Sequence, residues 1–427
     1  MATITLRSKV GRLVCVLAEL LVFLALAVWI VRSYSADRTA RRVDAASLER
    51  AIRYDPGNAE YHLRLGRVNQ YSITDVNPEL AVELLKRAAE LNPRNPQPWL
   101  ELSAAYGFQG NADAAETCLL RADRLAPRLP SIQWVIGNFF LLQGNTDQAF
   151  KHFQVVLAGT HQFDQILFRT AWKASEDPQK ILDELIPRKV ATEFGYLYFL
   201  LQENRLAEAL TVWQRIAASG ERFDAARVTA FLDRLISARL PSEAGEVWSD
   251  LVRTGLIPPT HQPAAQNLIV NGDIEEEILN LGFDWRITKV EGVHVTPDGS
   301  VFHSPSRALQ ISFNGKSNLY YLGLYQFVRV EPGRSYQLKG YLRTESITTD
   351  SGPRLRVQDA YDASQLQKFS ESVTGSSGGW NQIILDFTAG PRSELVVVGV
   401  ARLPSRKLDN QIAGTVWVDD VSLSPVR

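Results

Sequence analysis

The chain has 427 residues, a formal net charge of −1 and a hydrophobic content of 45%. This length is too great for a single core and predicts two or three domains, while the hydrophobic content is that of folded rather than disordered chains. The near balance of 46 basic and 47 acidic residues argues against a general nucleic-acid binder. The 2 cysteines, Cys15 and Cys118, match neither a disulfide framework nor a metal-binding spacing.

Residues 13–31 form an apolar run that is interrupted only by Glu19. Its length is close to the ~20 residues that cross a bilayer as a helix. We expect a retained single-pass anchor behind a tail of residues 1–12, and the alternative is a signal peptide cleaved at the weak site in residues 33–36. Basic residues flank both ends of the run, so they do not set its orientation. Glu19 either lies near the membrane interface or contacts another membrane helix.

Residues 81–153 contain two adjacent copies of one pattern of large, small and aromatic residues. Ala115 and Ala149 occupy equivalent positions about 34 residues apart. This period and order resemble the tetratricopeptide repeat, a pair of antiparallel helices. One such pair cannot bury its apolar face, so the pairs stack into a solenoid. We expect Trp99 and Tyr106 to fill the gaps between successive pairs.

The solenoid is predicted to span residues 44–256. Its pattern decays beyond Leu157, although Trp213 and Trp248 still mark the second helices of two atypical pairs, as expected near a solenoid end. The resemblance implies a groove that holds a segment of a protein partner. The Pro-rich residues 257–266 predict a stiff linker.

From Asn267 the apolar period changes from helical to two. Residues 324–330 and 336–343 alternate on either side of a turn, which predicts a β-hairpin. Three further alternating segments follow, at residues 382–387, 395–403 and 416–423. Several short strands of this kind predict a β-sandwich or jelly roll over residues 267–427.

Three motifs of this region make the prediction more specific: NLIVNGDIE (267–275), YQFVRVEPGRSYQLKGYLR (325–343) and VWVDDVSL (416–423). Together they resemble the galactose-binding-like jelly rolls of carbohydrate-binding modules, especially those found beside bacterial glycanases. The whole chain is therefore expected to be multidomain, with an N-terminal transmembrane helix, an all-α tetratricopeptide-type solenoid and a C-terminal all-β jelly-roll sandwich.

The resemblance implies a sugar-binding face. Lys339, Tyr341 and Arg343 share one side of their predicted strand because side chains alternate along a strand. The candidate glycan-binding residues are Gln326, Tyr341 and Arg343, with Tyr321 in second place. The alternative is that they are ordinary surface residues.

The resemblance also implies a structural calcium between the first and last strands. Calcium takes several hard oxygen ligands, and the matching residues are Asp273, Glu275 and Asp420, with Asp419 beside them. The alternative is that these acids form hydrogen bonds in turns without a metal. No other cofactor is expected.

The sequence contains no nucleophile elbow, phosphate-binding glycine loop or metalloprotease spacing. We therefore expect a non-enzymatic adaptor in the bacterial cell envelope, active in surface polysaccharide synthesis or export. Residues 13–31 would hold it in the cytoplasmic membrane with most of the chain outside the cytoplasm. The solenoid would bind an envelope protein and the sandwich a polysaccharide. The alternatives are a scaffold without a sugar ligand and a glycan-metabolising enzyme with an unrecognised site.

Overall fold

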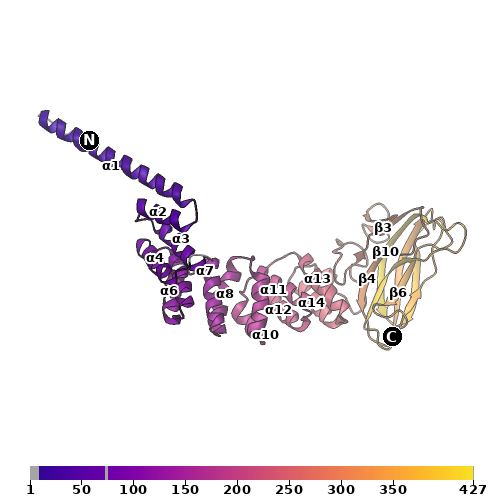
Figure 1. Cartoon of the computed structure of the whole chain (residues 1–427). Coiled ribbons are helices and arrows are strands. Elements are labelled where there is room, and N and C mark those ends of the chain that lie inside the picture. The colour runs from indigo at the N-terminus through magenta and orange to yellow at the C-terminus, as the bar shows by residue number, and fades with distance from the viewer. Residues whose placement is uncertain (1–8, 73–75, 427) are drawn as a thin grey trace. The chain divides into compact units, whose positions relative to one another are not determined.

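The computed structural model describes residues 9–72 and 76–426, and it divides into two compact units, residues 1–192 and 193–427. Within the described residues, fourteen α-helices precede ten β-strands (Figure 1). The predicted order of an apolar helix, a helical solenoid and a two-sheet sandwich is therefore confirmed. The predicted domain limits stay predictions, and part of the predicted tail lies outside the described residues.

The elements of the first unit are helical. They are α1 (Lys9–Ala40), α2 (Ala45–Tyr54), α3 (Ala59–Tyr71), α4 (Pro78–Leu91), α5 (Pro96–Phe108), α6 (Ala112–Leu125), α7 (Pro130–Leu142), α8 (Thr146–Gly159), α9 (Asp164–Ala174), α10 (Pro178–Lys180) and the π-helical turn η1 (Ile181–Leu185). Helix α11 (Val190–Gln202) begins at the division between the two units.

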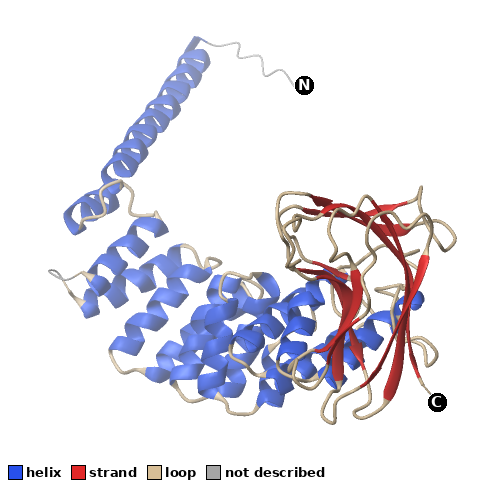
Figure 2. Cartoon of the chain, turned by 90° about the vertical axis from the view of Figure 1, so that its right-hand side faces the viewer, coloured by secondary structure: helices blue, strands red, loops and turns tan. Residues whose placement is uncertain are grey.

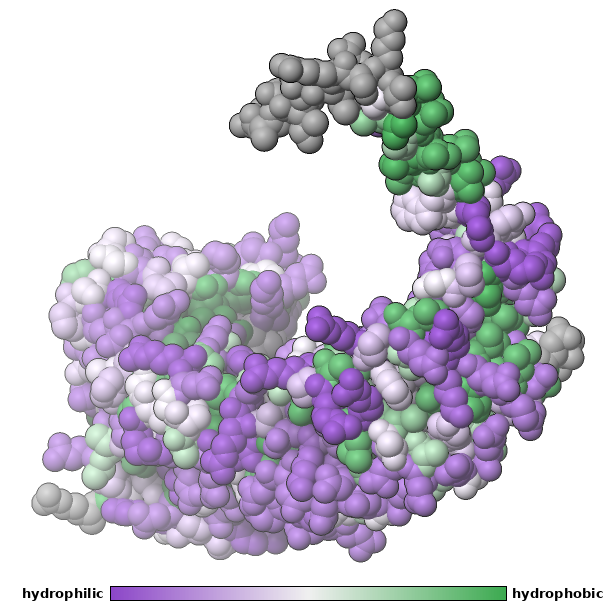
Figure 3. Space-filling model, turned by 90° about the vertical axis from the view of Figure 1, so that its left-hand side faces the viewer, coloured by the Kyte–Doolittle hydropathy of each residue, from purple (hydrophilic) through white to green (hydrophobic). Residues whose placement is uncertain are grey.

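Helix α1 exposes an apolar surface over most of its length (Figure 3). Its segment Leu13–Ala40 is long and apolar enough to cross a membrane, and a signal sequence would have the same properties. The end of α1 differs, because Ala36 and Ala40 are buried against Leu48 and Ala51 of α2. The apolar helix is thus packed onto the first helix of the solenoid.

The helices of the solenoid begin where the sequence supplies a cap. Asparagine side chains accept hydrogen bonds from the free backbone N–H groups of the first turn at five helices; these are Asn58, Asn77, Asn95, Asn111 and Asn145. Proline occupies the first turn of α4, α5 and α7, where its missing N–H costs nothing. Local chemistry therefore sets the helix boundaries.

Close packing within each helix pair depends on glycine. A Cβ atom at Gly66 of α3 would lie 2.8 Å from Leu85 Cγ of α4, and one at Gly137 of α7 would lie 2.4 Å from a ring carbon of Phe153 of α8. Between pairs, Trp99 packs partly buried against a core that includes Leu85, as predicted. The repeats therefore interlock through alternating small and large side chains.

The second unit contains the last helices and all ten strands. Its helical elements are α12 (Leu206–Ala218), η2 (Ala225–Val228), α13 (Thr229–Ser237), α14 (Pro241–Arg253) and η3 (Pro259–His261). Its strands are β1 (Arg286–Ile287), β2 (Val293–Asp298), β3 (Ala308–Asn314), β4 (Tyr321–Arg329), β5 (Ser335–Glu345), β6 (Arg354–Asp359), β7 (Gln367–Phe369), β8 (Asn381–Thr388), β9 (Leu395–Arg402) and β10 (Ala413–Pro425).

The strands form two antiparallel five-stranded sheets that enclose one apolar core (Figure 2). The strand orders are β1-β4-β9-β6-β7 and β2-β3-β10-β5-β8. The predicted hairpin of β4 and β5 is wrong, because β4 pairs with β9 and β5 pairs with β10 and β8. Their connecting turn crosses from one sheet to the other. Both strands still bury alternate side chains, so their sequence pattern is the same as in a hairpin.

The sandwich packs directly against α13 and α14. The ring of Trp248 in α14 lies 6.0 Å from that of Phe283, and Gly282 adopts φ +50° beneath it, where a Cβ atom would lie 2.5 Å from the indole. The Tyr361 hydroxyl donates to the Ile236 carbonyl over 2.8 Å. In the predicted linker, Ile257 and His261 are buried. The last helix pair and the sandwich therefore share one packed interface.

Candidate functional site

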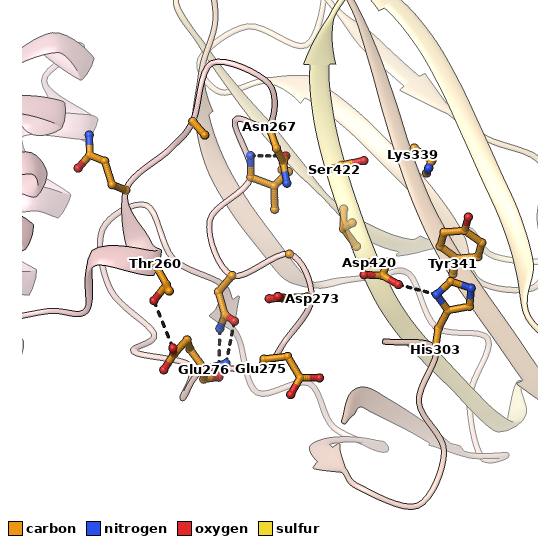
Figure 4. Close-up of a pocket in the computed structure, with 16 residues that line it drawn as sticks. Thr260, Asn267, Asp273, Glu275, Glu276, His303, Lys339, Tyr341, Asp420 and Ser422 are labelled. Atoms are coloured by element: carbon orange, nitrogen blue, oxygen red, sulfur yellow. Dashed lines mark hydrogen bonds and ion pairs between the residues drawn. The ribbon is translucent and has the colours of Figure 1, made fainter. Parts of the chain in front are cut away.

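A groove of about 600 Å³ lies beside β5 and β10, two inner strands of one sheet of the sandwich (Figure 4). Its walls are β5, the end of β10, the loop before β3 and the chain between η3 and β1. Most of the lining side chains are polar and carry hydroxyl, amide, carboxylate, imidazole or ammonium groups; they are Thr260, Gln262, Asn267, Asn271, Asp273, Glu275, Glu276, His303, Lys339, Tyr341, Asp420 and Ser422. The groove thus combines many hydrogen-bonding groups with an apolar surface of similar extent.

One wall of the groove is an aromatic pair. The rings of His303 and Tyr341 stack with centroids 3.8 Å apart and planes 18° apart. Trp380 meets the edge of His303, and Gln382 donates to the Tyr341 hydroxyl over 2.8 Å. His303 Nδ1 also bonds the Asp420 carboxylate. These contacts hold the Tyr341 ring in one orientation beside the cavity.

Glu275 joins the first segment of the sandwich to the loop before β3. Its carboxylate accepts hydrogen bonds from the Ser306 hydroxyl and from the backbone N–H groups of Ser306 and Arg307. Burial opposes ionisation of Glu275, but these bonds outweigh it and lower the pKa of the carboxyl. The Arg307 guanidinium donates to the carbonyls of Ile274, over 2.7 Å, and of Glu275.

Asp419 holds the same loop from the opposite side. Its Oδ2 accepts hydrogen bonds from the backbone N–H groups of His303 and Ser304, over 2.8 and 2.9 Å. Burial raises the pKa of Asp419, while these bonds act to lower it. The loop that positions His303 is therefore fixed by acids from both ends of the sandwich sequence.

The residues proposed for calcium do lie together, since Asp273, Glu275 and Asp420 all line the groove. Their arrangement does not fit a metal site, because among the described residues no three acidic, histidine or cysteine side chains gather closely enough to hold one. Glu275 and Asp420 are engaged by Ser306 and His303 instead. Two backbone carbonyls that could serve a cation accept from Arg307.

The four predicted glycan residues separate into two groups. Tyr341 lines the groove, and Arg343 lies two residues further on the same face of β5, over the ring of Trp417. Gln326 and Tyr321 are both 0% exposed, which corrects the expectation of surface residues. The Gln326 amide binds both the N–H and the carbonyl of Val270, and Tyr321 belongs to the apolar core. Neither residue therefore belongs to the candidate site.

His303, Glu276 and Ser422 were not predicted from the sequence. His303 follows β2 and reaches the groove only because its loop is held by residues more than one hundred positions later. Its single sequence signal is an aromatic FH pair in a loop of small residues. Glu276 accepts from Thr260 of η3 over 3.3 Å, so the segment after α14 also contributes to the wall.

No protein-family model matches the chain, and no curated protein is similar to it in sequence. Parts of the chain are similar to solved structures. A CBM4 carbohydrate-binding module is 15% identical, with 37% of this chain and 99% of that one covered and a TM-score of 0.28. MamA protein is 17% identical, with 45% and 91% covered and a TM-score of 0.27.

The enzymatically active domain of tailspike protein 4 from bacteriophage CBA120 is 19% identical, with a TM-score of 0.28. The similarity covers 38% of this chain and 21% of that protein, so the chain spans about a fifth of its length. At these identities and TM-scores, the similarities do not identify a ligand, a partner or an activity for this chain.

Proposed function

We propose that the chain is a membrane-anchored, non-enzymatic adaptor of the bacterial cell envelope whose β-sandwich binds a glycan in the groove beside Tyr341. The observation that carries the proposal is the aromatic pair of His303 and Tyr341 in a groove lined by hydroxyls, amides and carboxylates. Sugars are bound by an aromatic surface for the ring and by fixed polar groups for the hydroxyls. The solenoid would hold a protein partner, and α1 would hold the chain in the membrane.

A glycan-binding assay with the full chain in detergent micelles tests the proposal. A panel of bacterial oligosaccharides should give a specific signal that Tyr341→Ala abolishes. Gln337→Ala should preserve the signal, because Gln337 lies on the same face of β5 but outside the groove. A panel without any signal would favour the scaffold alternative. Release of shortened products from a bound oligosaccharide would favour the enzyme alternative.

The location of the sandwich decides whether an external glycan can reach it. Protease should cleave the sandwich in spheroplasts with an opened outer membrane, while intact cells protect it. Protection that lasts until the cytoplasmic membrane is lysed would place the sandwich in the cytoplasm and would overturn the envelope role. The proposed role of the chain in polysaccharide synthesis or export requires that the sandwich lies outside the cytoplasm.

A further inference from the structure

Two carboxylates in the groove, those of Asp273 and Glu276, are left free by the rest of the chain. The hydrogen bond described for Asp273 is accepted by its backbone carbonyl, from the Ser304 hydroxyl over 3.5 Å, and its exposed carboxylate has no described partner. The Glu276 carboxylate accepts one hydrogen bond, from the Thr260 hydroxyl over 3.3 Å. No described lysine, arginine or histidine forms an ion pair with either acid. Both carboxylates can therefore accept hydrogen bonds from a ligand.

The turn that carries these two acids does not need their carboxylates. Asn271 closes the turn, because its side chain accepts from the Glu276 N–H over 3.0 Å and donates to the Glu276 carbonyl over 3.1 Å. Elsewhere in the sandwich an acid does hold a turn, since Asp298 accepts from the N–H and the hydroxyl of Ser300. Asp273 makes no such bonds, so hydrogen bonding within a turn does not account for its carboxylate.

The groove is acidic as a whole. Its lining holds four carboxylates and the single ammonium group of Lys339, which leaves a formal charge of −3 when His303 is neutral. Two of the carboxylates are already engaged, because Glu275 accepts from backbone N–H groups and Asp420 bonds His303. Like charges repel one another in a confined site, so this groove disfavours a glycan that carries carboxylate, sulfate or phosphate groups.

The free acids and the ammonium group lie toward different ends of the groove. Lys339 Nζ lies over the Tyr341 ring, 5.6 Å from its centroid, and so belongs to the aromatic wall. Figure 4 shows Asp273 between Glu276 and Asp420, away from Lys339. A glycan that lies along the groove from the aromatic wall would therefore reach both free carboxylates at a part of the lining that carries no cation.

We propose that the glycan bound in this groove carries free amino groups, as a polymer of hexosamine units without N-acetyl groups does. This inference rests on the proposed glycan-binding function, because the groove with its aromatic pair, and not the acids alone, makes the site. An ammonium group donates charge-assisted hydrogen bonds to a carboxylate, which are roughly twice as strong as the bonds from a neutral hydroxyl. Its positive charge also offsets the repulsion among the carboxylates of the groove.

Titration calorimetry with the full chain in detergent micelles tests this inference. The probes are tetraglucosamine and cellotetraose, two tetramers of the same linkage that carry an amine or a hydroxyl at the same carbon of each ring. The titrations use physiological salt and about pH 6, at which amines are protonated and aspartate and glutamate side chains are ionised. Tetraglucosamine should bind at least about tenfold more tightly, because only its ammonium groups donate charge-assisted hydrogen bonds.

Substitutions of single charges give the sign of the effect. Asp273→Asn and Glu276→Gln should each weaken tetraglucosamine binding by about two- to fivefold and leave cellotetraose binding unchanged. Lys339→Met should strengthen tetraglucosamine binding by a similar factor, because it removes a repelling charge. Glu277→Gln removes the same charge from an exposed residue outside the groove and should change neither affinity. Should Asp273→Asn not fold, Glu276→Gln and Lys339→Met provide the same test.

The outcomes separate this inference from the proposed glycan function. Equal affinity for the two tetramers, with both lost in Tyr341→Ala, would overturn the amine preference and keep the glycan groove. A tighter ligand from the oligosaccharide panel that carries no amine and depends on Tyr341 would do the same. Tetraglucosamine binding that neither Asp273→Asn nor Tyr341→Ala alters would be adhesion of a polycation and would overturn the inference. The absence of any glycan signal would overturn the inference and the proposed function together.

Discussion

His303 lies face to face with Tyr341, and its Nδ1 bonds Asp420 of β10. The stack therefore joins a loop and two strands at the wall of the groove. The loop orients the aromatic ring that we propose as the sugar platform. Changes to either ring test the groove more directly than changes to the residues around it.

Replacing Tyr341 with alanine and with phenylalanine should separate the ring from its hydroxyl. Tyr341→Ala removes the stack and should weaken glycan affinity by about tenfold or more, which is ~1.4 kcal/mol. Tyr341→Phe keeps the ring and loses only the bond from Gln382, so it should retain most of the affinity. Calorimetry with an oligosaccharide selected from the panel measures both. Equal affinity in both variants would contradict the platform role.

Gln326→Met should destabilise the sandwich without affecting ligand binding. The buried amide accepts from Val270 N–H over 2.9 Å and donates to Val270 carbonyl over 2.8 Å, and both backbone groups would lose their partner. We expect a loss of about 2 to 4 kcal/mol in the free energy of unfolding. Urea unfolding measures it, with Gln337→Met at a half-buried position on the outer face of β5 as the control. An unchanged midpoint would contradict the structural role.

Gly137→Ala should destabilise the solenoid, whereas Gly107→Ala should not. A Cβ atom at Gly137 would clash with the Phe153 ring, while nothing lies within 4 Å of a Cβ atom at Gly107. We expect a loss of about 1 to 3 kcal/mol for the first and a gain of up to about 1 kcal/mol for the second, from the higher helix propensity of alanine. Thermal unfolding followed by far-UV circular dichroism compares them. A similar change of the unfolding temperature in both variants would mean that the contact between Gly137 and Phe153 does not determine the stability of the solenoid.

The stability that Glu275 contributes should depend on pH. Its lowered pKa means that the contribution is present above the unfolded-state pKa and is lost as the pH falls through the folded-state value. The difference in unfolding temperature between the natural chain and Glu275→Gln should be largest near about pH 7 and should shrink on acidification below about pH 4. A difference in unfolding temperature that does not vary with pH would mean that Glu275 stabilises the sandwich through its packing and not through its charge.

Calcium should not be needed to hold the first segment of the sandwich in place. Arg307 donates to the Ile274 and Glu275 carbonyls, so a side-chain cation already joins this segment to the start of β3. A chelator should leave the unfolding temperature of the full chain unchanged, while Arg307→Met should lower it. A drop on chelation that added calcium reverses would contradict this and would restore the calcium expectation.

The solenoid could be predicted because its determinants are local. The repeat spacing of Ala115 and Ala149 and the prolines and asparagines at the helix starts act within a few residues of the bonds that they form. The sheet partners of β4 and β5 could not be predicted, because a period of two shows which side chains face the core but not to which sheet a strand belongs. The burial of Gln326 could have been predicted, because Gln326 alternates in step with Leu324 and Val328, which face the core.

Only part of the candidate site could be predicted from the sequence. Tyr341 and the three acids were found because they lie on strands or in motifs with a recognisable pattern. His303 belongs to a loop whose position depends on Asp419 and Asp420, far away along the chain.

The contact of Trp248 with Phe283 and Gly282 has a mechanical consequence. A polymer that pulls on the sandwich would load the indole ring and the Arg286 to Asp233 ion pair before it stretched the chain between η3 and β1. Tension on a bound glycan would then pass into α13 and α14 as a shear force across a packed surface. Helices α13 and α14 would thus support the sandwich against that force.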